Sequence, residues 1–188
     1  MRPGAFLDLN GTLVEPVQVI SPEQYEPIPG CTEGIRLLNE AGYVCPVITV
    51  QGRIERGMYS EQTFLDWFTT FQVRLAEQDA HVVGPYVCPH RAGTDCVCKK
   101  PKPFLYEQAA RDHDIDCELS FVVGDTGGDI QAATAIGARG CFVQTGWSAK
   151  DIPEYGSEAC FIGTDILDVA GWISKERTTK AQSLPPRA

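Results

Sequence analysis

The chain has 188 residues, a formal net charge of −9 and 43% hydrophobic residues. A chain of this length can bury roughly two thirds of its unfolded surface behind one core, so folding needs no disulfide. The acidic charge argues against binding to nucleic acid, which is a polyanion. No apolar run approaches the roughly 20 residues that cross a bilayer, which argues against a membrane protein.

The domain organisation is expected to be simple. We predict one domain over residues 1–174 and a loose polar tail over residues 175–188. The N-terminal apolar stretch is too short for a signal peptide and contains Asp8, so the cytoplasm is the expected compartment. In a reducing compartment, cysteines scattered through apolar segments are predicted to be small core residues. These are Cys31, Cys45, Cys117, Cys141 and Cys160.

Apolar runs alternate with segments of helical periodicity along the chain. A short strand at Ala5–Leu7 precedes a helix that begins after Gly30 and ends at Gly42. Further strands are expected at residues 43–49, 81–87, 121–123 and 141–143, with a weaker one at 160–162. Further helices are expected after Ser60, at about 104–113 and 128–136, and through Ile166 and Trp172. This alternation predicts an α/β fold with a parallel, Rossmann-like sheet and helices on both of its faces.

Polar residues follow several of the predicted strands. Ligands bind outside the carboxyl ends of the strands in sheets of this kind, so these positions are candidates for a site. The first strand is followed by Asp8-Leu9-Asn10-Gly11-Thr12, and the second ends in Thr49-Val50-Gln51-Gly52. Lys99-Lys100-Pro101 precedes a helix, and Gly124-Asp125 with Asp129 follows the fourth strand. Together these segments supply carboxylates, a hydroxyl and an ammonium.

This ordered set resembles the four motifs of the haloacid dehalogenase (HAD) phosphatase superfamily, over residues 5 to about 146. The resemblance implies that Asp8 attacks a phosphate ester and forms an aspartyl-phosphate, which water then hydrolyses. It also implies Mg²⁺ bound by the carboxylates of Asp8 and Asp125 and the main-chain carbonyl of Asn10. Thr49 and Lys100 are then expected to hold the transferring phosphoryl oxygens, with Asp129 in a supporting role.

Position 10 departs from the family pattern, which has a second Asp there. That Asp protonates the leaving oxygen and later activates water, and the amide of Asn10 can do neither. General acid–base catalysis is worth about 10²- to 10⁴-fold, so turnover is expected to be lower by that order. Asn10 therefore indicates either an engineered trap or a protein of reduced or specialised activity, and the sequence leaves both open.

A cluster of metal-binding side chains lies before the lysine pair. Cys88, His90, Cys96 and Cys98 match a closed Cys₃His zinc site, because both pairs have the one-residue gap that lets their side chains converge. Such a site leaves no open position for substrate, so the Zn²⁺ is expected to be structural. Its role would be to fold the inserted loop that carries Lys99 and Lys100.

The zinc insert narrows the resemblance to the HAD branch that contains heptose 1,7-bisphosphate 7-phosphatases and histidinol-phosphatase domains. The resemblance implies a small phosphorylated metabolite, most of all a sugar bisphosphate, with Gln51, Arg53, Arg56 and Lys99 as substrate-binding candidates. Histidinol phosphate is the alternative substrate. A catalytically impaired phosphosugar-binding protein is the alternative of another class, favoured by the departures at Asn10, Val50, Gly52 and Thr126. Short connections predict a minimal cap, and a monomer is expected.

Overall fold

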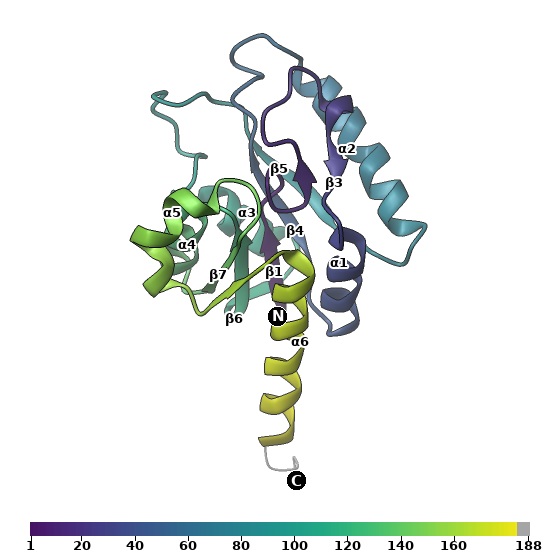
Figure 1. The fold of residues 1–188 in the computed structure, drawn as a ribbon, viewed down its shortest axis with the longest axis vertical. Coiled ribbons are helices and arrows are strands. Elements are labelled where there is room, and N and C mark those ends of the chain that lie inside the picture. Colours follow the sequence, from purple (N-terminus) through teal and green to yellow (C-terminus); the bar gives the residue numbers. More distant parts are fainter. Residues whose placement is uncertain (184–188) are drawn as a thin grey trace.

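Six parallel strands form one sheet in the computed structural model, which describes residues 1–183 and the side chains of residues 1–177 (Figure 1). Their spatial order is β5 (Val83–Cys88), β4 (Pro46–Val50), β1 (Arg2–Leu7), β6 (Ile115–Gly124), β7 (Arg139–Val143) and β8 (Phe161–Gly163). The chain moves outward from β1 to β5 and then returns to the other side of β1. The strand order therefore reverses beside β1, where ligands bind in doubly wound folds.

Helices cover both faces of this sheet, as the sequence predicts (Figure 1). One face carries α1 (Cys31–Glu40), α2 (Glu61–Ala76) and α6 (Ile166–Ser183). The opposite face carries α3 (Phe104–Asp112) and α4 (Gly127–Ala135), with α5 (Ser148–Tyr155) packed against α4 and β7. The predicted α/β class with a Rossmann-like sheet is therefore confirmed.

Alternate side chains of the central strands feed two separate cores. In β1, Ala5 and Leu7 pack with the first set of helices, whereas Phe6 packs with the second. Phe6 is fully buried and its ring meets that of Tyr106 edge-on, with centroids 5.7 Å apart. Truncating such a side chain to Ala costs about 3–5 kcal/mol, so β1 is held firmly from both faces. The residue after it, Asp8, is thereby placed on a rigid support.

Five short elements were not predicted. A two-stranded hairpin of β2 (Val14–Glu15) and β3 (Glu26–Pro27), with the 3-10 turn η1 (Pro22–Gln24) between its strands, connects β1 to α1. It forms the small cap that the short connection predicted. α5 was missed because it is short, polar and interrupted by Pro153, and a further 3-10 turn, η2 (Gly156–Glu158), follows it. Two-residue strands have no periodicity that a sequence pattern can reveal.

Two predictions need correction. The expected tail begins inside α6, which continues to Ser183, so residues 175–183 are helical; residues 184–188 lie outside the described part of the chain. The polar composition of this segment gave no apolar pattern from which a helix could be predicted. Among the five cysteines expected in the core, Cys160 is exposed because it lies in a bend before β8, and Cys117 is only half-buried. No helix in residues 1–183 has the length and apolar character needed to cross a membrane.

Candidate active site and metal centres

The candidate site lies where β1 and β6 end side by side. Asp8 follows β1 and Asp125 follows β6, and these two strands are hydrogen-bonded neighbours. Asp129 projects from the first turn of α4. The carboxylate oxygens of these three residues lie within 4.8 Å of one another. Residues separated by more than 100 positions in the sequence are thus brought to one point, as the strand-end argument predicts.

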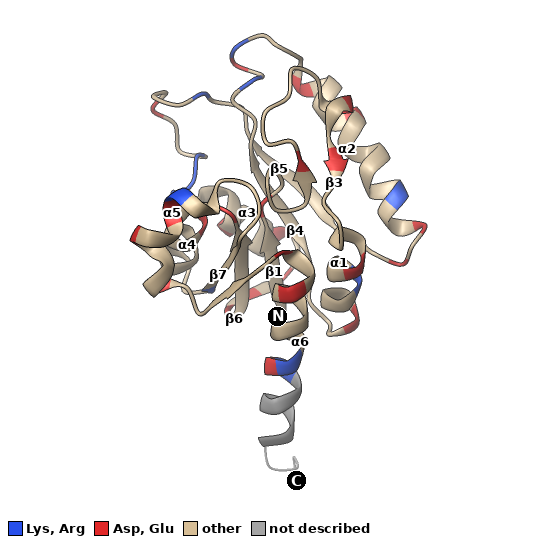
Figure 2. Ribbon diagram, in the orientation of Figure 1, with Lys and Arg blue, Asp and Glu red and all other residues tan. Residues whose placement is uncertain are grey.

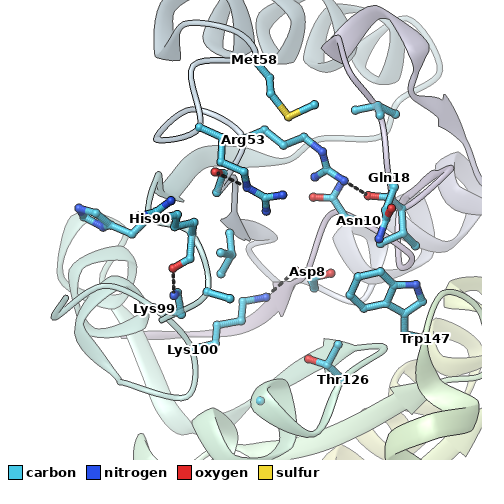
Figure 3. Close-up of a pocket in the computed structure, with 18 of the residues that line it drawn as sticks. Asp8, Asn10, Gln18, Arg53, Met58, His90, Lys99, Lys100, Thr126 and Trp147 are labelled. Carbon is cyan, nitrogen blue, oxygen red and sulfur yellow. Dashed lines mark hydrogen bonds and ion pairs between the residues drawn. The ribbon is translucent and has the colours of Figure 1, made fainter. Parts of the chain in front are cut away.

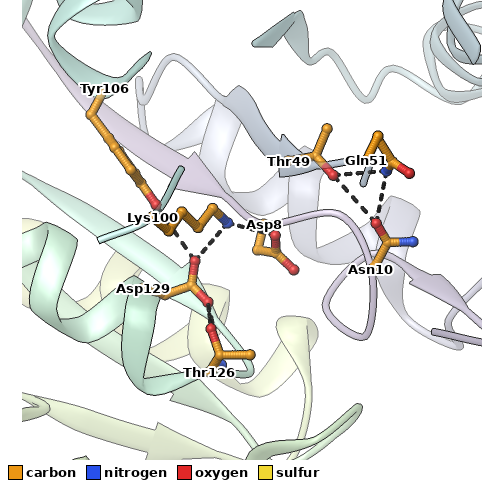
Figure 4. A network of polar contacts seen from close by, with 8 residues as sticks. All are labelled: Asp8, Asn10, Thr49, Gln51, Lys100, Tyr106, Thr126 and Asp129. Atoms are coloured by element: carbon orange, nitrogen blue, oxygen red, sulfur yellow. Dashed lines mark hydrogen bonds and ion pairs between the residues drawn. The ribbon is translucent and has the colours of Figure 1, made fainter. Parts of the chain in front are cut away.

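Lys100 neutralises part of this carboxylate cluster. Its Nζ lies 2.5 Å from Asp8 Oδ1 and 2.7 Å from Asp129 Oδ1, and its side chain is only 8% exposed (Figure 4). Burial alone lowers the pKa of a lysine, but the charges of Asp129 and Asp8 outweigh it and raise the pKa of Lys100 well above its ordinary value. The ammonium is therefore permanently charged and aimed at Asp8.

Asp129 is fixed by hydrogen bonds from both sides. Thr126 donates its hydroxyl to Asp129 Oδ2 at 2.7 Å, at the start of α4, and the Tyr106 hydroxyl lies 3.5 Å from Asp129 Oδ1 (Figure 4). One oxygen thus holds the helix start, and the other receives Lys100. The contacts of Asp129 therefore connect the start of α4 to Lys100.

The positive charge of Lys100 does not fully balance the carboxylates of Asp8 and Asp125. Burial, followed by the charges of Asp8 and Asp129, raises the pKa of Asp125 to about 8, and burial raises that of Asp8 to about 6. Asp125 Oδ2 accepts the Trp147 backbone N–H at 2.8 Å, whereas Asp125 Oδ1 is buried without a hydrogen-bond partner. An unpartnered buried carboxylate oxygen beside a second carboxylate is the donor set that a hard divalent cation such as Mg²⁺ requires.

Two glycines make room for Asp125. Gly11 and Gly146 both have positive φ, 87° and 62°, which side chains disfavour. A Cβ atom at Gly146 would lie 2.1 Å from Asp125 Oδ2, and one at Gly11 would lie 2.5 Å from the same atom. The carboxylate can occupy its place only because both positions lack a side chain.

A second polar network surrounds Asn10. Gln51 donates from Nε2 to Asn10 Oδ1 at 2.8 Å, and the Thr49 hydroxyl donates to the same oxygen at 3.3 Å (Figure 4). The Tyr59 hydroxyl donates to Gln51 Oε1 at 2.8 Å, which fixes the orientation of the Gln51 amide. Asn10 Nδ2 is buried and has no partner. The amide of Asn10 is therefore held by its oxygen, with its two N–H donors unused.

The cysteines and histidine of the inserted loop come together as predicted. Cys88 Sγ lies 3.8 Å from Cys96 Sγ and 3.7 Å from His90 Nδ1, and His90 Nδ1 lies 3.3 Å from Cys98 Sγ. A tetrahedral zinc site with ordinary bond lengths has sulfur–sulfur edges of about 3.8 Å and sulfur–nitrogen edges of about 3.6 Å. The four side chains thus fit zinc without rearrangement. Cys88 ends β5 and Cys98 lies two residues before Lys100, so the cluster anchors the loop at both ends.

A cavity of about 770 Å³ opens above these groups, with Asp8, Asn10 and Asp125 among its lining residues (Figure 3). Figure 2 shows that basic residues gather on the loops at the carboxyl ends of the strands. Those that line the cavity are Arg53, Arg56, Arg91, Lys99 and Lys100. A cavity with this lining suits a small ligand that carries more than one negative charge.

The substrate-binding candidates do not all line the cavity. Arg53, Arg56 and Lys99 do, although Arg53 also donates to the Val17 carbonyl at 2.9 Å and so holds the cap segment. Gln51 is fully buried behind Asn10 and is not part of the cavity wall, so its predicted contact with substrate needs correction. Its amide is consumed by Asn10, Thr49 and Tyr59, which the sequence pattern could not reveal.

Several lining residues were not predicted from the sequence, among them Trp147 and Arg91. Trp147 is half-exposed on the cavity wall (Figure 3). Arg91 lies on the inserted loop and also lines the cavity. Trp147 lies in the polar segment directly after β7. The same attention to strand ends that identified Asp8 and Asp125 would have found it. Nothing in the sequence pattern marks Arg91.

Comparisons with known proteins agree with this geometry. Residues 97–169 match a family model described as "HAD-hyrolase-like". The D-glycero-beta-D-manno-heptose-1,7-bisphosphate 7-phosphatase of Pseudomonas putida is 34% identical over 148 residues, covering 79% of this chain and 85% of that protein. The same enzyme of Pasteurella multocida is 33% identical over 178 residues, covering 90% of this chain and 95% of that protein.

A solved structure extends the likeness to the fold. The D,D-heptose 1,7-bisphosphate phosphatase of B. bronchiseptica, complexed with magnesium and phosphate, superposes with a TM-score of 0.84 at 29% identity. The match covers 93% of this chain and 99% of that one. The chain belongs to the D-glycero-D-manno-heptose-1,7-bisphosphate 7-phosphatase family of HAD-like, magnesium-dependent phosphatases.

Proposed function

We propose that this protein hydrolyses a small sugar phosphate, the 7-phosphate of a heptose 1,7-bisphosphate, through an aspartyl-phosphate on Asp8. The observation that carries the proposal is the convergence of the Asp8 carboxylate, the Lys100 ammonium and the unpartnered Asp125 oxygen at the floor of a cationic cavity. A carboxylate nucleophile needs positive charge between itself and a phosphate, and this arrangement supplies it.

The donor set supports two metal ions in different roles. Mg²⁺ would be held by the carboxylates of Asp8 and Asp125 and the main-chain carbonyl of Asn10, and it would neutralise charge on the phosphate. Zn²⁺ would be held by Cys88, His90, Cys96 and Cys98 and would keep Lys99 and Lys100 in place.

The residues of the chain supply the nucleophile and the positive charge for the first half of the reaction, but no acid to protonate the leaving oxygen. One Asp8 oxygen attacks phosphorus in line with the ester bond, a phosphorus–oxygen bond to Asp8 forms, and the sugar oxygen leaves. Lys100 balances the charge on the transferring oxygens. The Thr49 hydroxyl, expected to bind the same oxygens, is fully buried and donates to Asn10, so it would first have to release Asn10. The second half returns Asp8 when water attacks phosphorus and inorganic phosphate departs.

Asn10 limits both halves in this proposal. The leaving sugar oxygen needs a proton and the attacking water must lose one, and an amide can do neither. The unpartnered Nδ2 of Asn10 can instead donate a hydrogen bond to an oxygen of the bound ester. Either Asn10 is an engineered trap or the protein is naturally slow.

The cavity wall supports a bisphosphate over a histidinol phosphate. Arg53, Arg56 and Lys99 add cationic groups beyond Lys100, which matches a ligand with a second phosphate. The acidic side chains that line the cavity are Asp8 and Asp125, both already engaged at its floor, so an imidazole would have Trp147 to stack on but no free carboxylate. All these residues come from one chain, and we propose that a monomer is sufficient.

A substrate comparison tests the proposal. Phosphate release would be measured from heptose 1,7-bisphosphate and from histidinol phosphate, using the native chain and the Asn10→Asp variant, with Asp8→Asn as the inactive control. We expect release from the bisphosphate to be the faster by at least about tenfold. Faster release from histidinol phosphate would reverse the assignment. Tight binding by calorimetry, with no turnover even in Asn10→Asp, would favour a phosphosugar-binding protein.

A further inference from the structure

Two cysteines outside both candidate metal centres lie in contact. Cys141 is in β7, Cys160 is in the bend before β8, and their Sγ atoms are 3.4 Å apart. The close contact between the thiols of Cys88 and Cys96, by contrast, is explained by the zinc ion that we propose there. Nothing in the phosphatase chemistry uses Cys141 or Cys160, and their contact is therefore a separate feature of the fold.

The backbone holds the two residues at a distance that suits a disulfide. β7 and β8 are parallel neighbours with Cys141 opposite Phe161, and the Cys160 backbone N–H donates to the Gly140 carbonyl at 2.8 Å. Cys160 is thus diagonal to Cys141 across adjacent strands, where Cα atoms are expected to be about 6 Å apart, near the most common spacing in disulfides. The 3.4 Å between the sulfur atoms would have to shorten to about 2 Å when the bond forms.

The two thiols are unequal in exposure and in acidity. Cys160 is exposed, whereas Cys141 is fully buried among the side chains beneath α6. A hydrogen bond with Cys141, aided by the positive charge of Arg139, lowers the pKa of Cys160 to about 7. The same hydrogen bond and burial raise the pKa of Cys141. One accessible thiolate beside one buried thiol is the usual arrangement of an attacking and a resolving cysteine.

The remaining buried cysteines lack these properties. Burial raises the pKa of Cys31 and of Cys45 to about 12, so both remain protonated. Cys117 is half-buried and its pKa is also raised, mainly by burial. Cys160 is therefore expected to be the most reactive thiol outside the zinc cluster.

We propose that Cys141 and Cys160 form a redox-active pair that is oxidised to a disulfide by low-molecular-weight disulfides of the glutathione type. The Cys160 thiolate attacks one sulfur of the oxidant, whose disulfide bond breaks, leaving a mixed disulfide on Cys160 and a free thiolate. Cys141 then loses its proton to that thiolate and attacks the Cys160 sulfur, which expels the second small thiol. The protein loses two electrons and two protons, and the oxidant becomes two thiols.

The disulfide would close a covalent loop that includes residues in contact with the candidate active site. Residues 142–159 lie between the two cysteines and include Trp147, whose backbone N–H binds Asp125. They also include Asp151, which accepts the backbone N–H of Gly127 at the start of α4. Oxidation therefore restrains the segment that touches Asp125, although it does not depend on the proposed phosphatase activity.

The test is oxidation of the zinc-loaded protein with oxidised glutathione, followed by peptide mass spectrometry. We expect a loss of two hydrogens and a cross-linked peptide pair that contains Cys141 and Cys160. Cys160→Ser is expected to form no cross-link and no adduct at this site. Cys141→Ala is expected to keep a glutathione adduct on Cys160, because the resolving thiol is missing; Cys117→Ser serves as the matched control and retains the cross-link.

Two results would overturn the proposal. One is a glutathione adduct that persists on Cys160 in the native chain, since the buried thiol would then fail to resolve it. The other is oxidation of Cys117 before Cys160 reacts. At neutral pH we expect Cys160 to react at least about threefold faster than an exposed thiol of ordinary pKa, after allowing for its lower intrinsic nucleophilicity.

Discussion

Replacing Asn10 with Asp tests the proposed limit on turnover. One carboxylate oxygen would keep the hydrogen bond from Gln51 Nε2, now 2.8 Å from Asn10 Oδ1. The other would occupy the place of Nδ2, which is buried and has no partner to lose. Nearby Asp8 and Asp125 are expected to keep part of the new residue protonated, as a general acid requires. The change therefore adds an acid and base without breaking an existing contact.

The expected gain follows from the chemistry that the amide lacks. General acid–base catalysis contributes about 10²- to 10⁴-fold, which corresponds to about 3–5 kcal/mol of transition-state stabilisation. We expect phosphate release from a sugar phosphate to rise within that range in Asn10→Asp. The double variant Asp8→Asn/Asn10→Asp carries the new carboxylate without the nucleophile and is expected to stay inactive.

An aryl phosphate separates the two halves of the reaction. p-Nitrophenolate leaves without a proton, so the native chain is expected to release one equivalent rapidly and then stall at the aspartyl-phosphate. Asn10→Asp is expected to turn over continuously, because it can activate water. The measurement is stopped-flow absorbance at several enzyme concentrations. No increase in steady-state rate for Asn10→Asp, with Asp8→Asn inactive, would refute the claim that position 10 limits hydrolysis.

Three further predictions follow from the surroundings of the site. In the Asn10→Asp background, Gly146→Ala is expected to reduce phosphate release by at least about tenfold, because the new methyl group displaces Asp125. Gly137→Ala is the control, since Gly137 also has a positive φ but no neighbour that a methyl group would meet. Equal losses in both variants would contradict this explanation. Cys98→Ser is expected to lose zinc by metal analysis and to lower both melting temperature and activity, whereas Cys117→Ser keeps them; retained zinc would oppose the assignment. Without magnesium, the pKa values of Asp8, about 6, and Asp125, about 8, are raised in the folded protein. The folded state therefore binds protons that the unfolded state releases. The free energy of unfolding is expected to fall as pH rises from about 4 to 8. Added Mg²⁺ is expected to remove much of that fall, and a melting temperature with the same pH dependence in both buffers would count against a metal at these carboxylates.

The sheet and the convergence of the site were predictable from local patterns. Buried parallel strands are nearly continuous apolar runs, and this is why β1, β4 and β7 were found close to their true positions. Asp8 and Asp125 were found because the carboxyl ends of parallel strands meet at one edge. The cluster of Cys88, His90, Cys96 and Cys98 was predictable because these residues are close in sequence, so spacing alone determines their convergence.

The features that were missed depend on contacts distant in sequence. The place of Gln51 after a strand predicts contact with a ligand. Its side chain is instead held by Tyr59 and by Asn10, which lies 41 positions away. Cys160 has apolar neighbours in the sequence, and yet it is exposed because it lies in the bend before the short strand β8. The C-terminal part of α6 was taken for loose chain because its polar residues gave no apolar stripe.

The nucleophilic role of Asp8 is tested most directly by trapping the covalent intermediate. The native chain would be mixed with p-nitrophenyl phosphate and Mg²⁺, quenched, and reduced with borohydride, which converts an aspartyl-phosphate to homoserine. Peptide mass spectrometry is expected to find homoserine at position 8, with Asp125 and Asp129 unchanged and with no product in Asp8→Asn. Reduction at Asp125 or Asp129, or phosphate release without any modified aspartate, would contradict the account.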